Sequence, residues 1–309
     1  MAEKPQTWLI YGGKGWIGSQ FIHYVNQLYP NVNVVYGTSR CDDFYGVFDE
    51  INNCPELERV ICMIGRTTDP RTTDSTTDST TIDYLEQPGK LVDNIRDNLY
   101  SPLNLYDVCN SLGLHLTYLG TGCIYYTPRE ESREYTPEDD PNFFGSSYSI
   151  VKGFTDRYFN KSFAKLTTLN VRIRMPISDD LHPKSLITKL LKYHKICDCG
   201  PNSMTIFSDL LPVLAKAVME GKTGTMQLVN PGALTHDKIL NIYQEIVDPK
   251  FHYNLMPEEE QNRILRAKRS TCVLKPIYIT EPETPVPDTE TSLRRIFTRL
   301  AESNQSEDK

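Results

Sequence analysis

Short apolar runs alternate with longer stretches of helical periodicity along the first half of the chain. The stretches carry apolar residues every three or four positions, at 21–28, at 91–112 and from 146 onward. The apolar runs end in turn residues and occupy 8–11, 32–36, 60–64, 115–119 and 171–174. Runs of this length are typical of buried strands, and the longer pattern is typical of amphipathic helices. The alternation predicts an α/β fold with a doubly wound parallel sheet.

The pattern changes after Pro176. The acidic, proline-rich segment 280–291 should be extended, and Ser292 should cap a last helix that ends at Leu300. Further elements are predicted as a short helix at 187–193, a buried helix at 210–219, a strand at 227–229 and a helix at 237–247 opened by Thr235. We therefore expect a smaller C-terminal lobe. The domains divide as a sheet domain over 1–175 with 205–232 returning to it, a lobe over 176–204 and 233–300, and a disordered tail over 301–309.

One stretch, 68–81, carries neither pattern. It repeats Thr-Thr-Asp-Ser almost in tandem and holds no apolar residue. Such a segment cannot bury enough apolar surface to offset the entropy lost on ordering. We expect a mobile insertion there.

Composition narrows the classes of function. The 309 residues are 39% hydrophobic and 24% charged, as in an ordinary globular protein, and the net charge is −7. This charge argues against a nucleic-acid partner or an anionic membrane surface. The N-terminal residues have no apolar signal core and no run approaches the length of a membrane span, so we expect a cytoplasmic protein.

The eight cysteines show no disulfide framework, and a chain of this size does not need one. Cys197 and Cys199 form a Cys-x-Cys pair with no matching His or Cys nearby in the sequence. We therefore expect no metal site.

The first apolar run leads directly into a glycine-rich turn. Gly12, Gly15 and Gly18 follow at three-residue intervals, and a helical pattern begins there. Glycines in this context allow a tight turn and let the backbone approach a pyrophosphate, which the N–H groups at the helix start then bind. The motif predicts dinucleotide binding, and the alternative is a glycine-rich connector without a ligand.

The second apolar run ends in Gly-Thr-Ser-Arg, and its last residue, Arg40, bears on the choice of cofactor. An acidic residue near this place suits the ribose 2′-hydroxyl of NADH, whereas an Arg suits the 2′-phosphate of NADPH. Arg40 thus favours NADPH, and Asp42 and Asp43 just beyond keep NADH as the alternative. Arg40 could equally be a solvated loop charge.

Tyr148 and Lys152 are four residues apart at the start of a predicted helix and share one face of it. After a dinucleotide-binding half, such a pair can carry out carbonyl chemistry. The Lys ammonium lowers the phenol pKa and binds the nicotinamide ribose, and the Tyr exchanges a proton with the substrate oxygen. Thr121, upstream, can supply a second hydroxyl. The alternative for the pair is an exposed Tyr–Lys contact on a helix.

Together these motifs resemble the extended short-chain dehydrogenase/reductases, whose fold is a Rossmann-type doubly wound sheet with a smaller C-terminal substrate-binding lobe. Within that superfamily the chain is similar to the nucleotide-rhamnose synthases, which are bifunctional 3,5-epimerase/4-reductases. The resemblance runs from residue 9 to about 240. The stretches that carry it are LIYGGKGWIGS, TYLGTGCIYY, PNFFGSSYSIVKG, RIRMPISDDLHPKSLITKL, PNSMTI and NPGALTHDKIL.

The resemblance implies a reaction and assigns roles. A UDP- or dTDP-linked 4-keto-6-deoxyglucose would be epimerised at C3 and C5, with Cys123 as base and Lys189 as acid, and reduced at C4 by NADPH. Tyr148 and Thr121 would stabilise the enolate oxygen. His182 is a lesser candidate for the acid, because related fucose-forming enzymes use a His. Without the resemblance, Cys123 would be read as a small buried residue at a strand end.

The resemblance also implies the oligomeric state and the ligand contacts. The enzyme should be a homodimer with no nucleic-acid or membrane partner. The residues expected at the cofactor are Gly12, Gly15, Trp16, Ile17, Gly18, Arg40, Asn98, Tyr148 and Lys152, and those expected at the substrate are Arg66, Asn202, Ser203, Met204 and Arg269.

The chain departs from the family pattern in places. The acidic-aromatic run after the Cys is 124–127, Ile-Tyr-Tyr-Thr, and the Arg-Ser-Asn of the C-terminal lobe is 269–271, Arg-Ser-Thr. A sugar 4,6-dehydratase is disfavoured, since it would place Thr-Asp-Glu where 121–123 read Thr-Gly-Cys. Two alternatives stay open: a 4-keto reductase without epimerase activity and a non-catalytic scaffold with this fold.

Overall fold

The computed structural model describes residues 6–69 and 80–307, the last four of these by their backbone. Most of the expected mobile insertion at 68–81 therefore lies outside the described residues.

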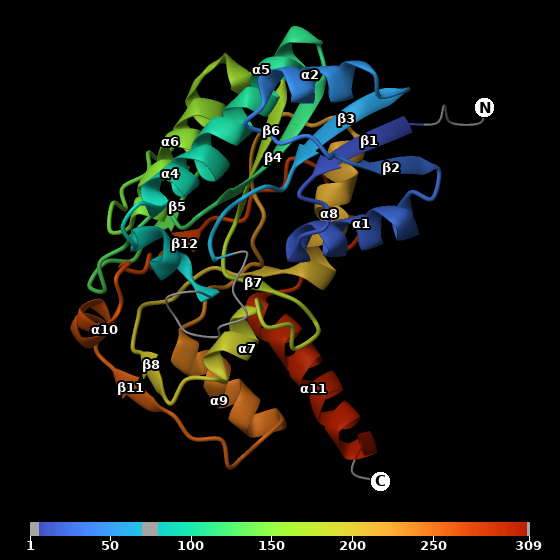
Figure 1. Cartoon of the computed structure of the whole chain (residues 1–309). Coiled ribbons are helices and arrows are strands. Elements are labelled where there is room, and N and C mark those ends of the chain that lie inside the picture. The colour runs from blue at the N-terminus through green and yellow to red at the C-terminus, as the bar shows by residue number, and fades with distance from the viewer. Residues whose placement is uncertain (1–5, 70–79, 308–309) are drawn as a thin grey trace.

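Six parallel strands form the central sheet in the order β10–β6–β4–β3–β1–β2 (Figure 1). Their bounds are β1 Gln6–Tyr11, β2 Val32–Tyr36, β3 Leu57–Cys62, β4 His115–Thr121, β6 Thr168–Ile173 and β10 Gly224–Gln227. The predicted doubly wound parallel sheet is confirmed. The chain first extends the sheet from β1 to β2 and then returns to the other side of β1 with β3. This reversal of strand order creates the crevice at which open α/β sheets bind ligands.

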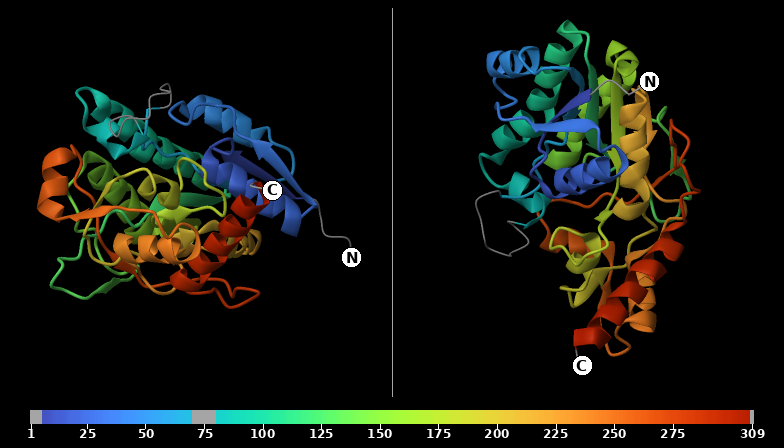
Figure 2. Two further views of the ribbon diagram at one scale, coloured as in Figure 1. Left: turned by 90° about the horizontal axis from the view of Figure 1, so that it is seen from below. Right: turned by 90° about the vertical axis from the view of Figure 1, so that its right-hand side faces the viewer.

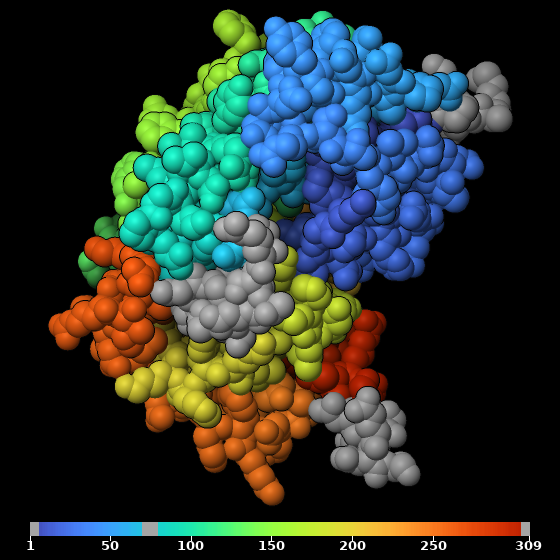
Figure 3. Space-filling view, in the orientation of Figure 1, coloured from blue at the N-terminus to red at the C-terminus, as the bar shows by residue number. Residues whose placement is uncertain are grey.

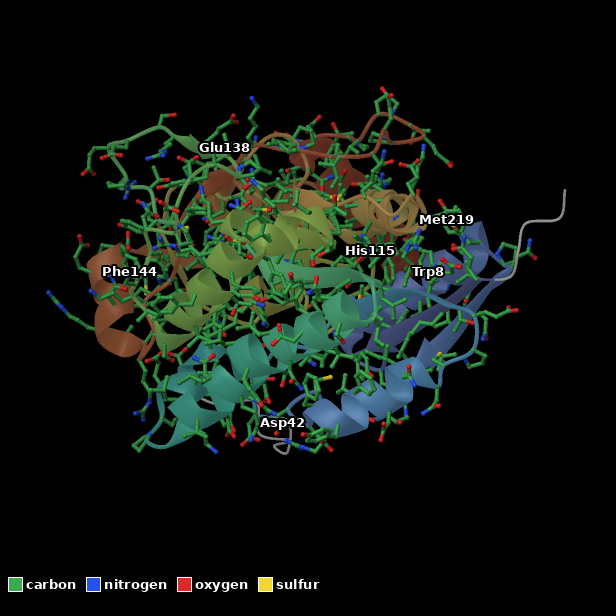
Figure 4. All side chains as sticks on the ribbon, turned by 90° about the horizontal axis from the view of Figure 1, so that it is seen from above. Trp8, Asp42, His115, Glu138, Phe144 and Met219 are labelled. Carbon is green, nitrogen blue, oxygen red and sulfur yellow. The ribbon has the colours of Figure 1, made fainter. Side chains whose placement is uncertain are left out.

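Helices cover both faces of the sheet, so the strands β1, β4 and β6 are buried on both sides (Figure 2). Along β1, Trp8 and Ile10 pack in one cluster while Leu9 and Tyr11 pack in another. Trp8 and Met219, both labelled in Figure 4, belong to the first cluster. The helices are α1 Trp16–Leu28 and α8 Phe207–Met219 on the first face, and α2 Phe44–Asn52, α5 Ser101–Ser111 and α6 Ser147–Lys161 on the second.

The helix predicted at 91–112 forms in three parts. These are α4 Lys90–Ile95, a π-helical turn η2 Arg96–Tyr100 and α5. Pro102 lies at the start of α5 and has no N–H with which to continue the α-helical pattern of hydrogen bonds. Single π-helical turns inside helices occur frequently at functional sites, and Asn98 lies in this one.

The smaller lobe packs below the carboxyl edge of the sheet in Figure 1. Its core joins Ile187, Ile239 and Phe297 from three of its helices. The elements are α7 Leu186–Leu190, β8 Lys195–Cys197, α9 His236–Ile246, β11 Asn254–Met256, α10 Glu258–Ile264 and α11 Thr289–Glu307. Two-residue strand pairs join distant segments, β7 Pro176–Ile177 with β9 Thr205–Ile206 and β5 Glu134–Tyr135 with β12 Val273–Leu274, and the short 3₁₀ turns are η1 Ile82–Glu86 and η3 Phe163–Leu166.

The last helix differs from the prediction at both ends. It begins at Thr289 because Asp288, not Ser292, accepts a hydrogen bond from a first-turn N–H, that of Thr291 at 2.9 Å. It also runs to Glu307, through most of the tail that was expected to be disordered. Thr235 caps α9 as predicted, accepting from the Lys238 N–H at 3.1 Å. Among the described residues, none of the helices has the length and apolar character needed to cross a bilayer.

A buried ion pair fastens α6 to the sheet. Arg172 on β6 donates from Nη2 and Nε to the two carboxylate oxygens of Asp156, at 2.7 and 2.8 Å. The side chains are 0% and 2% exposed. Because neither charge reaches water, each depends on the other for solvation.

Asp156→Ala should therefore lower the free energy of unfolding by about 3–5 kcal/mol, since it leaves the Arg172 guanidinium buried and unpaired. Urea unfolding followed by circular dichroism measures this. A matched control is Glu260→Ala, which removes an exposed pair of similar length, Lys195–Glu260 at 2.8 Å, and should cost less than about 1 kcal/mol. Equal losses in the two variants would show that burial of the pair does not matter.

Candidate active site

A cavity of about 700 Å³ opens between the carboxyl edge of the sheet and the smaller lobe. The molecular surface is hollowed beside the blue N-terminal segment in Figure 3. The lining combines residues from both lobes. Those predicted from the sequence are Gly12, Gly15, Trp16, Ile17, Gly18, Thr121, Cys123, Tyr148, Lys152, Lys189, Asn202 and Arg269.

The glycine turn between β1 and α1 has the geometry of a pyrophosphate site. Gly12 adopts a φ of +80°, and the Gly15 N–H donates to its carbonyl at 3.0 Å. A Cβ on Gly18 would lie 2.4 Å from that same carbonyl oxygen, so no other residue fits there. The Trp16 indole Nε1 is buried without a hydrogen-bond partner. With the first N–H groups of the 13-residue α1 beside it, this turn fits the diphosphate of a dinucleotide.

Arg40 and the carboxylate of Glu50 both lie at the loop that follows β2. The Arg40 side chain is 70% exposed and pairs with Asp42 at 2.9 Å. Glu50, on α2, accepts from the Thr38 N–H at 2.7 Å and from the Ser39 N–H at 3.0 Å. Burial opposes the charge of Glu50, but these hydrogen bonds hold its pKa below the ordinary value. Glu50 was missed from the sequence because α2 was not predicted.

Tyr148 and Lys152 both line the cavity, but their side chains have different partners. Burial raises the pKa of Tyr148, and a hydrogen bond with Thr121 opposes that rise. Lys152 donates from Nζ to the hydroxyl of Tyr118 and to the Leu119 carbonyl, and lies 4.5 Å from the centre of the Tyr118 ring. Burial lowers the pKa of Lys152 to about 8. Burial has the largest effect on the phenol pKa, and Lys152 is not among the groups that shift it here, so the expectation that Lys152 lowers this pKa stays a prediction.

Cys123 follows β4 and is partly exposed to the cavity, which does not fit the alternative of a packed, inaccessible thiol. Its N–H donates to Thr121 Oγ1 at 3.1 Å, so the loop holds the two side chains together. Arg174 donates from Nη1 to the Cys123 sulfur at 2.8 Å. Sequence reasoning missed Arg174, although its place directly after β6, at the carboxyl edge of the sheet, was a signal.

The two candidate acids lie in different surroundings. Lys189, on α7, lines the cavity, and burial together with the positive charges of Arg269 and Lys184 lowers its pKa. His182 is not among the lining residues. Its ring stacks on Trp16 at 5.0 Å, and its Nδ1 accepts from the Lys184 N–H at 3.1 Å. The geometry favours Lys189 over His182 as the acid.

Of the five residues expected at the substrate, two line the cavity. Asn202 is fully buried, and Arg269 pairs with Asp83 and donates to the Ala267 carbonyl at 2.7 Å. The other three, Arg66, Ser203 and Met204, are not part of the lining. They are engaged elsewhere: Arg66 pairs with Asp97, Ser203 hydroxyl bonds Leu274, and Met204 packs in the core of the smaller lobe.

Asn98 was expected at the cofactor but is also absent from the cavity lining. Its amide accepts from the Arg66 N–H and donates to the Arg66 carbonyl, both at 2.9 Å. The side chain thus fixes the loop after β3, and it acts on the cavity through that loop.

The described residues hold no group of three or more His, Cys, Asp or Glu side chains placed to share a metal ion. The fold nevertheless brings a His to Cys199 from a distant part of the sequence. The start of α9 brings His236 Nδ1 to 3.6 Å from the Cys199 sulfur, at one end of the same cavity.

No family model matches the chain. The chain is 43% identical over 296 residues to protein L780 of Acanthamoeba polyphaga mimivirus, covering 95% of this chain and 98% of that one. The crystal structure of that viral protein, described as a UDP-rhamnose synthase, superposes over 96% of this chain with a TM-score of 0.87.

A plant protein is also similar. It is the bifunctional dTDP-4-dehydrorhamnose 3,5-epimerase/dTDP-4-dehydrorhamnose reductase of Arabidopsis thaliana, 34% identical over 269 residues, or 85% of this chain and 83% of that protein. A dTDP-4-dehydrorhamnose reductase of Bacillus anthracis, solved in complex with NADP, shares the fold with a TM-score of 0.73 at 14% identity over 96% of this chain and all of that one. From the two closer relatives and the arrangement of the cavity, the chain belongs to the nucleotide-rhamnose synthase family of extended short-chain dehydrogenase/reductases.

Proposed function

We propose that the chain is a bifunctional 3,5-epimerase and NADPH-dependent 4-reductase that converts UDP-4-keto-6-deoxyglucose into UDP-L-rhamnose. The observation that carries the proposal is the meeting of two sets of groups in one cavity. Cys123 and Lys189 provide an acid–base pair for epimerisation, and Tyr148 lies with Lys152 beside the glycine turn for reduction. The UDP carrier is proposed because the viral relative is described as a UDP-rhamnose synthase.

Epimerisation needs a base and an acid on opposite sides of a sugar ring. The C4 ketone acidifies the hydrogens on C3 and C5, so the Cys123 sulfur removes a proton and the electron pair moves onto the ketone oxygen. Tyr148 and Thr121 stabilise the oxyanion by hydrogen bonding. Lys189 then returns a proton to the other side of the carbon. The low pKa of the buried Lys189 ammonium makes it a better acid than an exposed lysine.

Reduction takes place on the same ketone after both centres are inverted. When bound, NADPH would supply the hydride to C4. Tyr148 donates the proton to the C4 oxygen, and its burial keeps the phenol protonated at neutral pH. Lys152 would hold the nicotinamide ribose and orient it. NADPH is proposed from Arg40 and from the NADP complex of the Bacillus anthracis relative, with NADH as the alternative.

The proposal extends to the cellular compartment and the oligomeric state. All eight cysteines are free thiols, which fits the reducing cytoplasm. The homodimer that the resemblance implies stays an expectation, and sedimentation equilibrium of the intact chain measures it.

The proposed reaction is tested by incubating the protein with UDP-4-keto-6-deoxyglucose and NADPH and identifying the sugar by NMR. UDP-L-rhamnose should form with one NADPH oxidised per molecule. Tyr148→Phe should slow reduction by roughly 10²–10⁴-fold, because no proton donor remains, with little change in NADPH affinity. A reduced sugar that keeps its original configuration at C3 and C5 would indicate a reductase without epimerase activity. NADPH binding with no turnover would indicate a scaffold.

Cofactor choice depends on Arg40. The exposed guanidinium can turn from Asp42 to a 2′-phosphate. Arg40→Ala should therefore lower kcat/KM for NADPH roughly tenfold, the value of a charge-assisted hydrogen bond, and leave kcat/KM for NADH nearly unchanged. Steady-state kinetics with both cofactors measure this, and Asp42→Asn is the control that keeps the guanidinium. Equal loss with both cofactors, or no loss with either, would argue against a phosphate contact at Arg40.

Epimerisation can be followed apart from reduction, as exchange of the C3 and C5 hydrogens with deuterated water. Cys123→Ala should lose this exchange by about 10²–10⁴-fold and still reduce a 4-keto sugar that is already epimerised. Lys189→Ala retains the base, so its conversion to the epimer should fall more steeply than its exchange. If Cys123→Ala incorporates deuterium at the wild-type rate, another group is the base.

A further inference from the structure

Arg174 is a buried cation whose ionisable partners are thiols, those of Cys123 and Cys272. Its side chain is 2% exposed. One terminal nitrogen, Nη2, donates to Asn202 Oδ1 and to the Ser270 carbonyl, the other contacts the Cys123 sulfur, and Nε has no partner. Among the described residues, no carboxylate lies within ion-pair distance of Arg174. A buried charge without a counter-ion is costly, so the surroundings must supply an anion.

The neighbouring Arg172 provides an internal comparison. Arg172 lies on β6, two residues before Arg174, and is just as buried. Its charge is balanced by both carboxylate oxygens of Asp156. A carboxylate therefore balances the buried guanidinium of Arg172, whereas no described carboxylate lies within ion-pair distance of Arg174. At Arg174 the sulfur of Cys123 stands where Arg172 has a carboxylate.

Other groups near Cys123 and Arg174 are engaged elsewhere or neutral. Hydrogen bonds with Cys197 and His236 lower the pKa of Cys199, and its sulfur is held by the His236 ring at 3.6 Å and the Asn202 amide at 3.7 Å, with no hydrogen bond to Arg174. Tyr148 and Lys152 face Cys123 from α6; the phenol stays protonated and Lys152 is a second cation. Cys272 is fully buried near Cys123. The Cys272 thiol donates its proton in a hydrogen bond to the Gly122 carbonyl at 3.4 Å. Burial raises the pKa of Cys272, which keeps it neutral.

The charge of Arg174 itself is secure. Burial alone would lower the pKa of its guanidinium, but the neighbouring sulfur groups, that of Cys123 first, raise it above the ordinary value. An Arg is in any case charged at every accessible pH. The thiol of Cys123, by contrast, is neutral in its ordinary state at pH 7, and only the thiolate can act as a base.

We propose that Arg174 is a positioning residue for the epimerisation half of the proposed reaction: it is the counter-ion that holds Cys123 as a thiolate aimed into the cavity. In the reaction, the thiolate takes a proton from the carbon next to the ketone. A C–H bond breaks, an S–H bond forms, and the negative charge moves to the ketone oxygen. The cost of separating Arg174 from its anion is met by Tyr148 and Thr121 at that oxygen.

The first test concerns the thiol alone and does not depend on the sugar. The wild-type protein is alkylated with iodoacetamide at a series of pH values, and each cysteine is quantified by peptide mass spectrometry. Cys123 should react with a midpoint below the value of about 8.5 for a free cysteine. The partly buried Cys54, whose pKa burial raises, is the reference in the same digest. A Cys123 midpoint at or above 8.5 would overturn the proposal, and this holds even if no Arg174 variant folds.

The second test separates a charge effect from a structural one. Arg174→Gln should move the Cys123 midpoint up by at least one pH unit and slow deuterium exchange at pH 7 at least tenfold, with the rate rising again toward high pH. Arg174→Lys, which keeps the charge, should recover much of both. An exchange rate lowered equally at every pH, with the midpoint unchanged, would show that Arg174 only supports the fold. A low wild-type midpoint without any exchange would count against the proposed function and leave the counter-ion assignment intact.

Discussion

The parallel arrangement of the sheet determines where everything else in this protein lies. All six strands point the same way, so their carboxyl ends meet at one edge. The glycine turn after β1, the Thr121–Cys123 loop after β4 and Arg174 after β6 come from distant parts of the sequence, yet they meet at that edge because each directly follows a strand. The smaller lobe then encloses the edge and contributes Lys189 and Arg269.

Arg172 on β6 and Arg174 directly after this strand are both buried, but their guanidinium groups have different roles. The Arg172–Asp156 pair has no opening to the cavity and holds α6, the helix of Tyr148 and Lys152, against the sheet. Arg174 uses the same chemistry at the cavity wall, with a sulfur in place of the carboxylate. The first arrangement stabilises the scaffold, and the second sets the charge state of a reacting group.

The sequence predicts five of the six sheet strands because each is a short apolar run closed by turn residues, but it places the sixth at 227–229, whereas β10 is Gly224–Gln227. It predicts the glycine turn and the Tyr148–Lys152 pair because local spacing encodes them, whereas Cys123 is predicted only through the family resemblance. It misses α2, a nine-residue helix with Gly46 in its first turn, and therefore misses Glu50. It also predicts ligand contacts for Asn98, Ser203 and Met204. The side chains of Asn98 and Ser203 instead hydrogen-bond other residues of the protein, and that of Met204 packs in the core of the smaller lobe. The residues around Arg174 come from segments near 123, 202 and 270. These segments are far apart in the sequence, so no local pattern predicts that they come into contact.

Lys152 already has partners inside the protein, and this limits what it can add to cofactor affinity. Its ammonium donates to Tyr118 and to the Leu119 carbonyl. A ribose hydroxyl that binds Lys152 must compete with these acceptors, so the contact exchanges one hydrogen bond for another and yields only the difference. The buried lysine is thereby held near its working place, so that less conformational freedom is lost when the ribose arrives. In the proposed mechanism, Lys152 thus contributes more to the orientation of the nicotinamide than to the strength with which the dinucleotide is held.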